Sequence, residues 1–163
     1  MVEQESVPGG SRDFDFFMGR WRVENKLLVG RLRGSTEWET FEAAVHAWPL
    51  PGGIGNYNEF VPEGWRLGYV GMALRIFNPE TRLWSIYWVD NQTGVLQPPV
   101  VGRFKNGVGI FEEEDELDGR PILARFTWSD ISRNGARWEQ AFSPDNGKTW
   151  ETNWVMVFTR VAD

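Results

Sequence analysis

The fold of this chain is decided by residues 101–131, VGRFKNGVGIFEEEDELDGRPILARFTWSDI, which read as strands separated by two short turns. The turns are Asn106-Gly107 and Asp118-Gly119. Both dipeptides favour a two-residue hairpin loop of type I′, because its two central residues need positive φ angles. Asn134-Gly135 gives a third signal of the same kind. Together these turns predict a series of antiparallel hairpins.

Strand and turn signals continue in both directions from this stretch. They predict ten strands, at residues 20–32, 37–48, 54–61, 66–77, 82–90, 95–104, 108–117, 121–131, 135–143 and 149–161. The gaps between them are too short for crossover helices, which excludes a parallel α/β sheet. Closing the resulting meander removes its exposed edges, so the predicted fold class is all-β, an antiparallel up-and-down barrel of about ten strands.

The first part of the chain is expected to lie outside the barrel. We expect residues 1–12 to be a disordered leader and residues 13–18 to form a short helical turn. The barrel domain is expected to span residues 13–163. The leader has no apolar segment typical of a secretory signal, and no stretch approaches the roughly 20 apolar residues that span a bilayer. We therefore expect a cytoplasmic protein with no membrane span.

The composition excludes several classes of function. The chain of 163 residues has no cysteine, which rules out disulfides and thiolate metal sites. Its net charge is -6 and its only lysines, Lys26, Lys105 and Lys148, are scattered, which argues against nucleic-acid binding. No metal site is expected, and the acidic run 112–116 is interpreted as a solvated strand and turn. The composition leaves a homo-oligomer open.

The aromatic content is the most informative number in the composition. The chain has ten tryptophans, eleven phenylalanines and three tyrosines, and each large ring can bury roughly 150–250 Å². So many rings exceed the needs of a plain core, and they predict either an aromatic-lined cavity or thick plugs at the barrel ends. Because barrels wider than eight strands tend to leave a lumen, we favour a ligand-sized cavity.

Alternation along the strands predicts which side chains face that cavity. The faces assigned inward are Trp84, Ile86, Trp88 and Asp90; Ala136, Trp138, Gln140 and Phe142; and Trp150, Thr152, Trp154, Met156, Phe158 and Arg160. Arg75 and Arg125 lie in otherwise apolar strands, where they are either surface cations or inward cations that need an acid or a ligand carboxylate. The predicted ligand-binding residues are Trp88, Asp90, Arg125, Trp138, Gln140, Trp154 and Met156.

The pattern favours binding or carriage of a small hydrophobic or aromatic molecule. An alternative is an isomerase, cyclase or hydrolase in the same cavity, with His46 or Asp90 as the candidate catalytic residue. A third possibility is a solid barrel that oligomerises through its aromatic residues. Residues 143–150, SPDNGKTW, match the Asp-box of sialidases, which we interpret as a hairpin staple in which Asp145 accepts hydrogen bonds from the turn.

Residues 14–21, FDFFMGRW, resemble the opening of lipocalin-like (calycin) barrels, which begin with a helical turn and a Gly-x-Trp, here Gly19 to Trp21. The resemblance implies that a late arginine, Arg160, packs over this tryptophan and closes one barrel end. Residues 77–90, 101–111 and 138–143 resemble a bacterial family of unknown function with this fold. Nitrobindin-like haem proteins also open with Gly-x-Trp but bind iron through a late histidine. The only histidine here is the early His46, so no haem and no other cofactor is expected.

Overall fold

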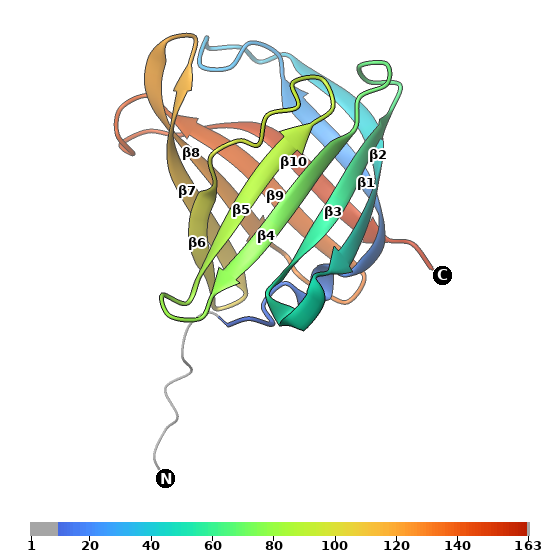
Figure 1. Cartoon of the computed structure of the whole chain (residues 1–163). Coiled ribbons are helices and arrows are strands. Elements are labelled where there is room, and N and C mark those ends of the chain that lie inside the picture. Colours follow the sequence, from blue (N-terminus) through green and yellow to red (C-terminus); the bar gives the residue numbers. More distant parts are fainter. Residues whose placement is uncertain (1–9, 163) are drawn as a thin grey trace.

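The computed structural model describes residues 10–162, which form a closed barrel of ten antiparallel strands (Figure 1). The strands are β1 (Gly19–Leu28), β2 (Trp38–Pro49), β3 (Gly55–Glu63), β4 (Gly71–Asn78), β5 (Leu83–Asp90), β6 (Val100–Lys105), β7 (Val108–Leu117), β8 (Arg120–Ser129), β9 (Gly135–Ser143) and β10 (Glu151–Arg160). Each strand pairs with its neighbours in sequence, and β1 pairs with β10 to close the barrel. The predicted fold class is confirmed. Residues 1–9 of the predicted leader lie outside the described residues.

Two of the three predicted tight turns are confirmed. Asn106, Gly107, Asp118 and Gly119 all have positive φ angles, between 51° and 80°, as a type I′ turn requires. The prediction for Asn134-Gly135 is wrong, because residues 130–134 form a longer connection in which the positive φ falls on Asp130. Gly135 instead begins β9 and pairs with Thr159.

Most inner faces follow the predicted alternation, and one strand departs from it. Trp84 and Ile86 of β5 are buried, as expected. In β10 the pairing register shifts between Thr152 and Trp154, which face Ala141 and Gln140 in turn. This β-bulge places the preceding residues on the other face. Trp150 and Thr152 were predicted to face inward and do not: Trp150 lies on the outer surface, stacked beneath Arg125.

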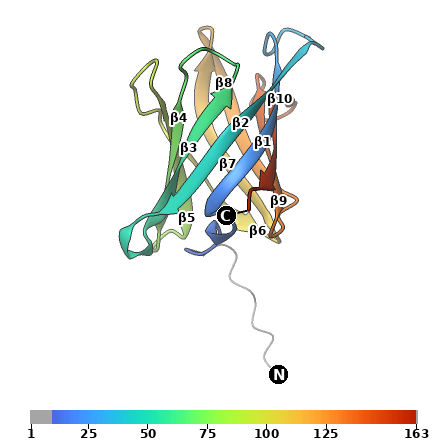
Figure 2. The same ribbon diagram turned by 90° about the vertical axis from the view of Figure 1, so that its right-hand side faces the viewer.

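The two ends of the barrel are built differently, as Figure 2 shows. The N-terminal segment with the 3-10 turn η1 (Asp15–Phe17) covers one end, which we call the closed end. The connections 29–37, 64–70, 91–99 and 144–150 lie at the opposite end, which we call the mouth. Among residues 10–162, no helix has the length and apolarity needed to cross a membrane.

Arg160 fastens the closed end. Its guanidinium lies 4.1 Å from the Trp21 ring centre, and it donates hydrogen bonds to the main-chain oxygens of Met18 (2.7 Å), Phe16 (2.5 Å) and Arg133 (2.7 Å). The Trp21 indole N–H donates to the Phe17 oxygen at 2.8 Å. The packing that the lipocalin-like resemblance implied for Arg160 is therefore present, and it joins the last strand to the helical turn.

The Asp-box segment forms a turn staple at the mouth. The Asp145 carboxylate accepts from the Thr149 main-chain N–H (2.8 Å) and hydroxyl (2.6 Å), and from the Ser143 hydroxyl (2.9 Å). The hydrogen bond from the Thr149 hydroxyl is the largest influence that lowers the pKa of Asp145, to about 2. The Trp150 indole N–H donates to the Gly147 oxygen, so every key residue of the motif serves the turn.

The geometry at Arg160 predicts a clear stability effect. Arg160→Lys retains the charge but lacks the planar fork that reaches several carbonyl groups and stacks on an indole. We expect the free energy of unfolding to fall by about 2 kcal/mol, the magnitude typical of lost charge-assisted hydrogen bonds. Urea denaturation measures it. Arg12→Lys is the matched control, since Arg12 is exposed and its guanidinium pairs with the exposed carboxylate of Asp15. Equal losses in the two variants would contradict the role given to Arg160.

Candidate functional site

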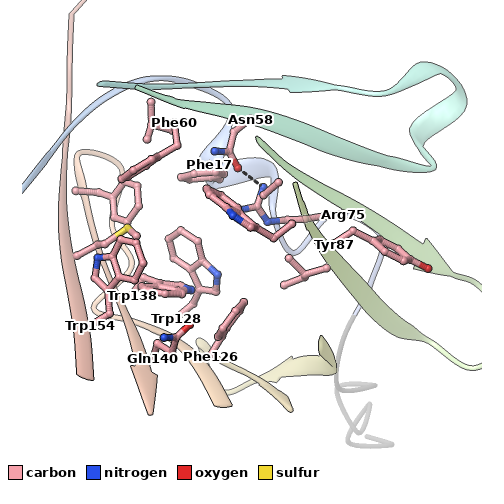
Figure 3. A pocket seen from close by; sticks show the side chains of 16 residues that line it. Phe17, Asn58, Phe60, Arg75, Tyr87, Phe126, Trp128, Trp138, Gln140 and Trp154 are labelled. Atoms are coloured by element: carbon pink, nitrogen blue, oxygen red, sulfur yellow. Dashed lines mark hydrogen bonds between the residues drawn. The ribbon is translucent and has the colours of Figure 1, made fainter. Parts of the chain in front are cut away.

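A cavity of about 130 Å³ lies inside the barrel (Figure 3). For comparison, a cavity of about 150 Å³ in another protein holds one benzene molecule, so the volume fits a single aromatic ring. The lining residues are Phe17, Val45, Asn58, Phe60, Ala73, Arg75, Ile86, Tyr87, Trp88, Phe126, Trp128, Trp138, Gln140, Trp154, Met156 and Phe158. The Tyr87 side chain points away from the cavity, so the lining is mainly apolar rings and aliphatic groups.

Aromatic side chains that contact one another form the wall nearest the mouth. Trp138 and Trp154 meet edge to face with ring centres 6.0 Å apart, and Phe60 lies 6.3 Å from Trp154 and 6.0 Å from Trp88. The Trp154 indole N–H donates to the Asn25 side-chain oxygen at 3.0 Å, which fixes the orientation of this ring. A wall with fixed ring positions holds a preformed shape.

Polar contacts also fix Gln140, which the sequence predicted beside these indoles. Its amide N–H donates to the side-chain oxygen of Asn153 at 2.9 Å. Asn153 is fully buried, although alternation placed it on the outer face, because the β10 bulge turns it inward. The structure thus brings five of the predicted ligand-binding residues to one cavity: Trp88, Trp138, Gln140, Trp154 and Met156. Their role in binding stays a prediction.

Asp90 and Arg125 do not line the cavity: the place predicted for Asp90 in the cavity is wrong, and Arg125, for which both faces were left open, lies on the outer one. Asp90 ends β5 at the mouth, where its carboxylate accepts from the main-chain N–H groups of Thr93 and Gln92, both at 2.9 Å. The hydrogen bond from Thr93 is the largest influence that lowers the pKa of Asp90, and the carboxylate serves the turn. Arg125 lies on the outer face of β8, where it donates to Glu112 at 2.7 Å.

His46, the other candidate catalytic residue, is also outside the cavity. It lies on the outer face of β2, between the inward-facing Val45 and Ala47, and its ring stacks on Trp48 with centres 3.7 Å apart. The predicted general-base role for His46 or Asp90 inside the barrel is therefore not supported by their placement. Among the described residues, no three histidines or carboxylates form a group that could hold a metal ion.

Arg75 is the polar residue that sequence reasoning left undecided, and it faces inward. Its side chain donates from Nη1 to the side-chain oxygens of Asn58 (2.7 Å) and Asn56 (3.1 Å) of the neighbouring strand. The guanidinium lies 4.8 Å from the Phe17 ring centre and 5.1 Å from that of Phe14. Arg75 is 5% exposed, and burial lowers its pKa to about 9, so it stays charged at neutral pH.

The sequence did contain a signal for this inward arginine. Asn56 and Asn58 alternate along β3, both are buried, and Asn56 pairs directly with Arg75. Two asparagines on one inner face of a barrel need a donor to satisfy their side-chain oxygens. An inward cation on the adjacent strand meets that need.

A cluster of rings lies between the cavity wall and the mouth. Phe41 and Trp65 stack almost parallel with centres 4.5 Å apart, and Trp65 also contacts Trp154 (6.0 Å) and Tyr69 (5.2 Å). The Arg66 guanidinium lies 4.4 Å from the Trp65 ring centre. Trp65, Arg66 and Tyr69 belong to the connection between β3 and β4, so this connection borders the route to the cavity from the mouth.

The acidic run 112–116 was interpreted as a solvated strand and turn, but one of its residues, Glu113, is partly buried. It shares the inner face of β7 with the buried Phe111 and pairs with the buried Ala124, whereas Glu112 and Glu114 point outward and are exposed. Partial burial, with a smaller contribution from Asp115, raises the pKa of Glu113 to about 7. This carboxyl group lies on the inner face but not in the cavity lining.

No protein-family model matches this chain, and a search of curated proteins finds no match. Among solved structures, the chain is similar to the S-type phycobiliprotein lyase CPES from Guillardia theta, with a TM-score of 0.59 and 10% sequence identity. The alignment covers 92% of this chain and 91% of the lyase chain. At this identity the likeness shows the fold alone, which is that of a lipocalin-like barrel. Membership of a bacterial family of unknown function stays a prediction.

The close contact between Gly71 and Trp88 predicts that the cavity wall is sensitive to one methyl group. A Cβ atom at Gly71 would lie 2.1 Å from the Trp88 ring, so Gly71→Ala must displace this indole. We expect a loss of about 1–3 kcal/mol in the free energy of unfolding, as in other overpacked cores, and a changed near-ultraviolet circular dichroism spectrum. Gly135→Ala is the control, because its Cβ would meet nothing closer than 3.5 Å. An unchanged spectrum in Gly71→Ala would contradict the placement of Trp88.

The raised pKa of Glu113 predicts a pH-dependent effect on stability. Because the folded protein holds this proton more tightly than the unfolded chain, ionisation of Glu113 destabilises the fold as the pH rises from about 4.5 to about 7. Glu113→Gln should therefore match the wild type at pH 4 and exceed it by about 1 kcal/mol at pH 8, a value reduced for solvent screening. Urea denaturation at both pH values measures this. The exposed Glu114→Gln is the control, and a gain in Glu113→Gln that did not depend on pH would refute the assignment.

Proposed function

We propose that this barrel binds a small aromatic molecule in its central cavity. The observation that carries the proposal is the cavity itself, since protein interiors are normally packed without such voids. This chain has many large aromatic side chains, which could fill the interior of the barrel. In the structure they surround a cavity.

The lining supports an aromatic guest. Trp88, Trp138 and Trp154 line the cavity, and an edge-to-face or offset ring contact adds about 0.5–1.5 kcal/mol beyond area burial. Met156 adds a sulfur that interacts well with ring edges. The volume admits one ring, so a larger ligand must extend part of its structure toward the mouth.

Binding is better supported than acid–base catalysis in the same cavity. None of the residues that line the cavity is a histidine, an aspartate or a glutamate. His46 and Asp90 are outside it, and Glu113 is on the inner face beyond its lining. A solid barrel is disfavoured by the volume that remains. The lyase that shares this fold is named for its action on phycobiliproteins, which supports a role for this barrel shape beyond a structural one.

Benzamide, a neutral single-ring compound, tests the proposal. At ten times its Kd it should stabilise the wild type by about 1.4 kcal/mol, which raises the Tm by roughly 3–6 °C for a domain of this size. Ala73→Leu adds bulk to the cavity wall and should abolish the Tm rise, whereas Ala44→Leu, on the outer face of β2, should retain it. Differential scanning calorimetry measures both. No Tm rise in the wild type with either benzamide or the similarly shaped benzoate at millimolar concentration would contradict the proposal.

A further inference from the structure

We infer that the aromatic molecule bound in the cavity carries a carboxylate, and that Arg75 holds it. The inference rests on the proposed function, because it specifies the chemical class of the same ligand. Arg75 is the only charged residue among those that line the cavity. The hydrogen bonds and the charge of Arg75 indicate which chemical group on a ligand would pair with it.

The hydrogen bonds of Arg75 do not satisfy all of its donors. A guanidinium has five N–H donors. The Nη1 group donates to Asn56 and Asn58, while Nε is buried with no hydrogen-bond partner. The two asparagine oxygens therefore do not use all the donors of this guanidinium, and a carboxylate is the acceptor with which a guanidinium makes its strongest hydrogen bonds.

The charge of Arg75 is not neutralised by the protein. Within residues 10–162, no carboxylate lies at ion-pair distance from Arg75. Two neutral amide oxygens and the nearby rings of Phe14, Phe17 and Trp128 offset part of the burial cost, but they supply no counter-charge. A buried cation without a paired anion is rare in folded proteins. An anion that enters with the ligand supplies the missing charge.

The geometry of the barrel fits a ligand with one charged end and one aromatic end. Arg75 is on β4, while Trp138 and Trp154 are on β9 and β10, on the opposite side of the closed barrel. Figure 3 shows Arg75 and Asn58 on one side of the cavity and the two indoles on the other. A carboxylate at Arg75 therefore places an attached ring against the aromatic wall. A neutral or cationic guest would leave the guanidinium unpaired.

The matched pair benzoate and benzamide tests this inference, since the two have nearly the same shape and differ in charge. Isothermal titration calorimetry of the wild type should give a Kd for benzoate at least about tenfold below that for benzamide, as one hydrogen bond to a charged group supplies. Equal affinities, or a preference for benzamide, would overturn the inference and leave the proposed function in place. Failure of both compounds to bind would overturn the proposed function as well.

Variants then identify the anchor. Arg75→Met should remove the preference for benzoate while benzamide still binds, because the apolar wall is unchanged. Arg125→Met is the control, since Arg125 lies on the outer face, and it should keep the preference. A preference that survived in Arg75→Met would place the anchor elsewhere. Should Arg75→Met fail to fold, Arg75→Gln removes the charge but keeps a hydrogen-bonding side chain; it should also lose the preference, and an undiminished preference there would place the anchor elsewhere.

Discussion

Pairing of β1 with β10 is the constraint on which the rest of this structure depends. It converts a meander of hairpins into a closed barrel in which every strand pairs with a neighbour on each side. Arg160 reinforces the seam, because its side chain joins β10 to the main chain of residues 16–18 while stacking on Trp21 of β1. Closure also directs every inner face to one shared space, so side chains far apart in sequence become neighbours.

The width of the barrel and the rigidity of its rings explain why that space is not filled. Phe14, Phe17 and Trp128 pack at the closed end, where Phe14 and Phe17 contact Trp128 at 6.1 Å and 5.0 Å between ring centres. Toward the mouth, Trp138 and Trp154 are held edge to face, and Trp154 is fixed by a hydrogen bond to Asn25. Rings held this way cannot collapse inward to fill a void as flexible side chains would. The cavity is thus a consequence of a wide barrel with stiff walls.

The strand order and the main cavity wall could be predicted from the sequence, because turn dipeptides fix strand ends and a period of two fixes faces. Trp88, Trp138 and Trp154 were found in this way. The prediction failed for Trp150, because a bulge shifts the register without any change in the alternation of residue types. It failed for Asp90 for a different reason. Alternation gives the face of a residue but not its depth along the barrel, and Asp90 lies at the mouth.

The residue pattern within a single strand does not predict which face Arg75 and Arg125 take. The side chains on the neighbouring strand determine it. Both lie in apolar strands, yet Arg125 meets Glu112 outside the barrel while Arg75 meets Asn56 and Asn58 inside it. The difference lies in the partner strand, which supplies an anion in one case and neutral amides in the other. An apolar residue at position 75 would avoid burying a charge. Local choices that work against stability concentrate at functional sites, and this buried cation is part of the lining of the cavity.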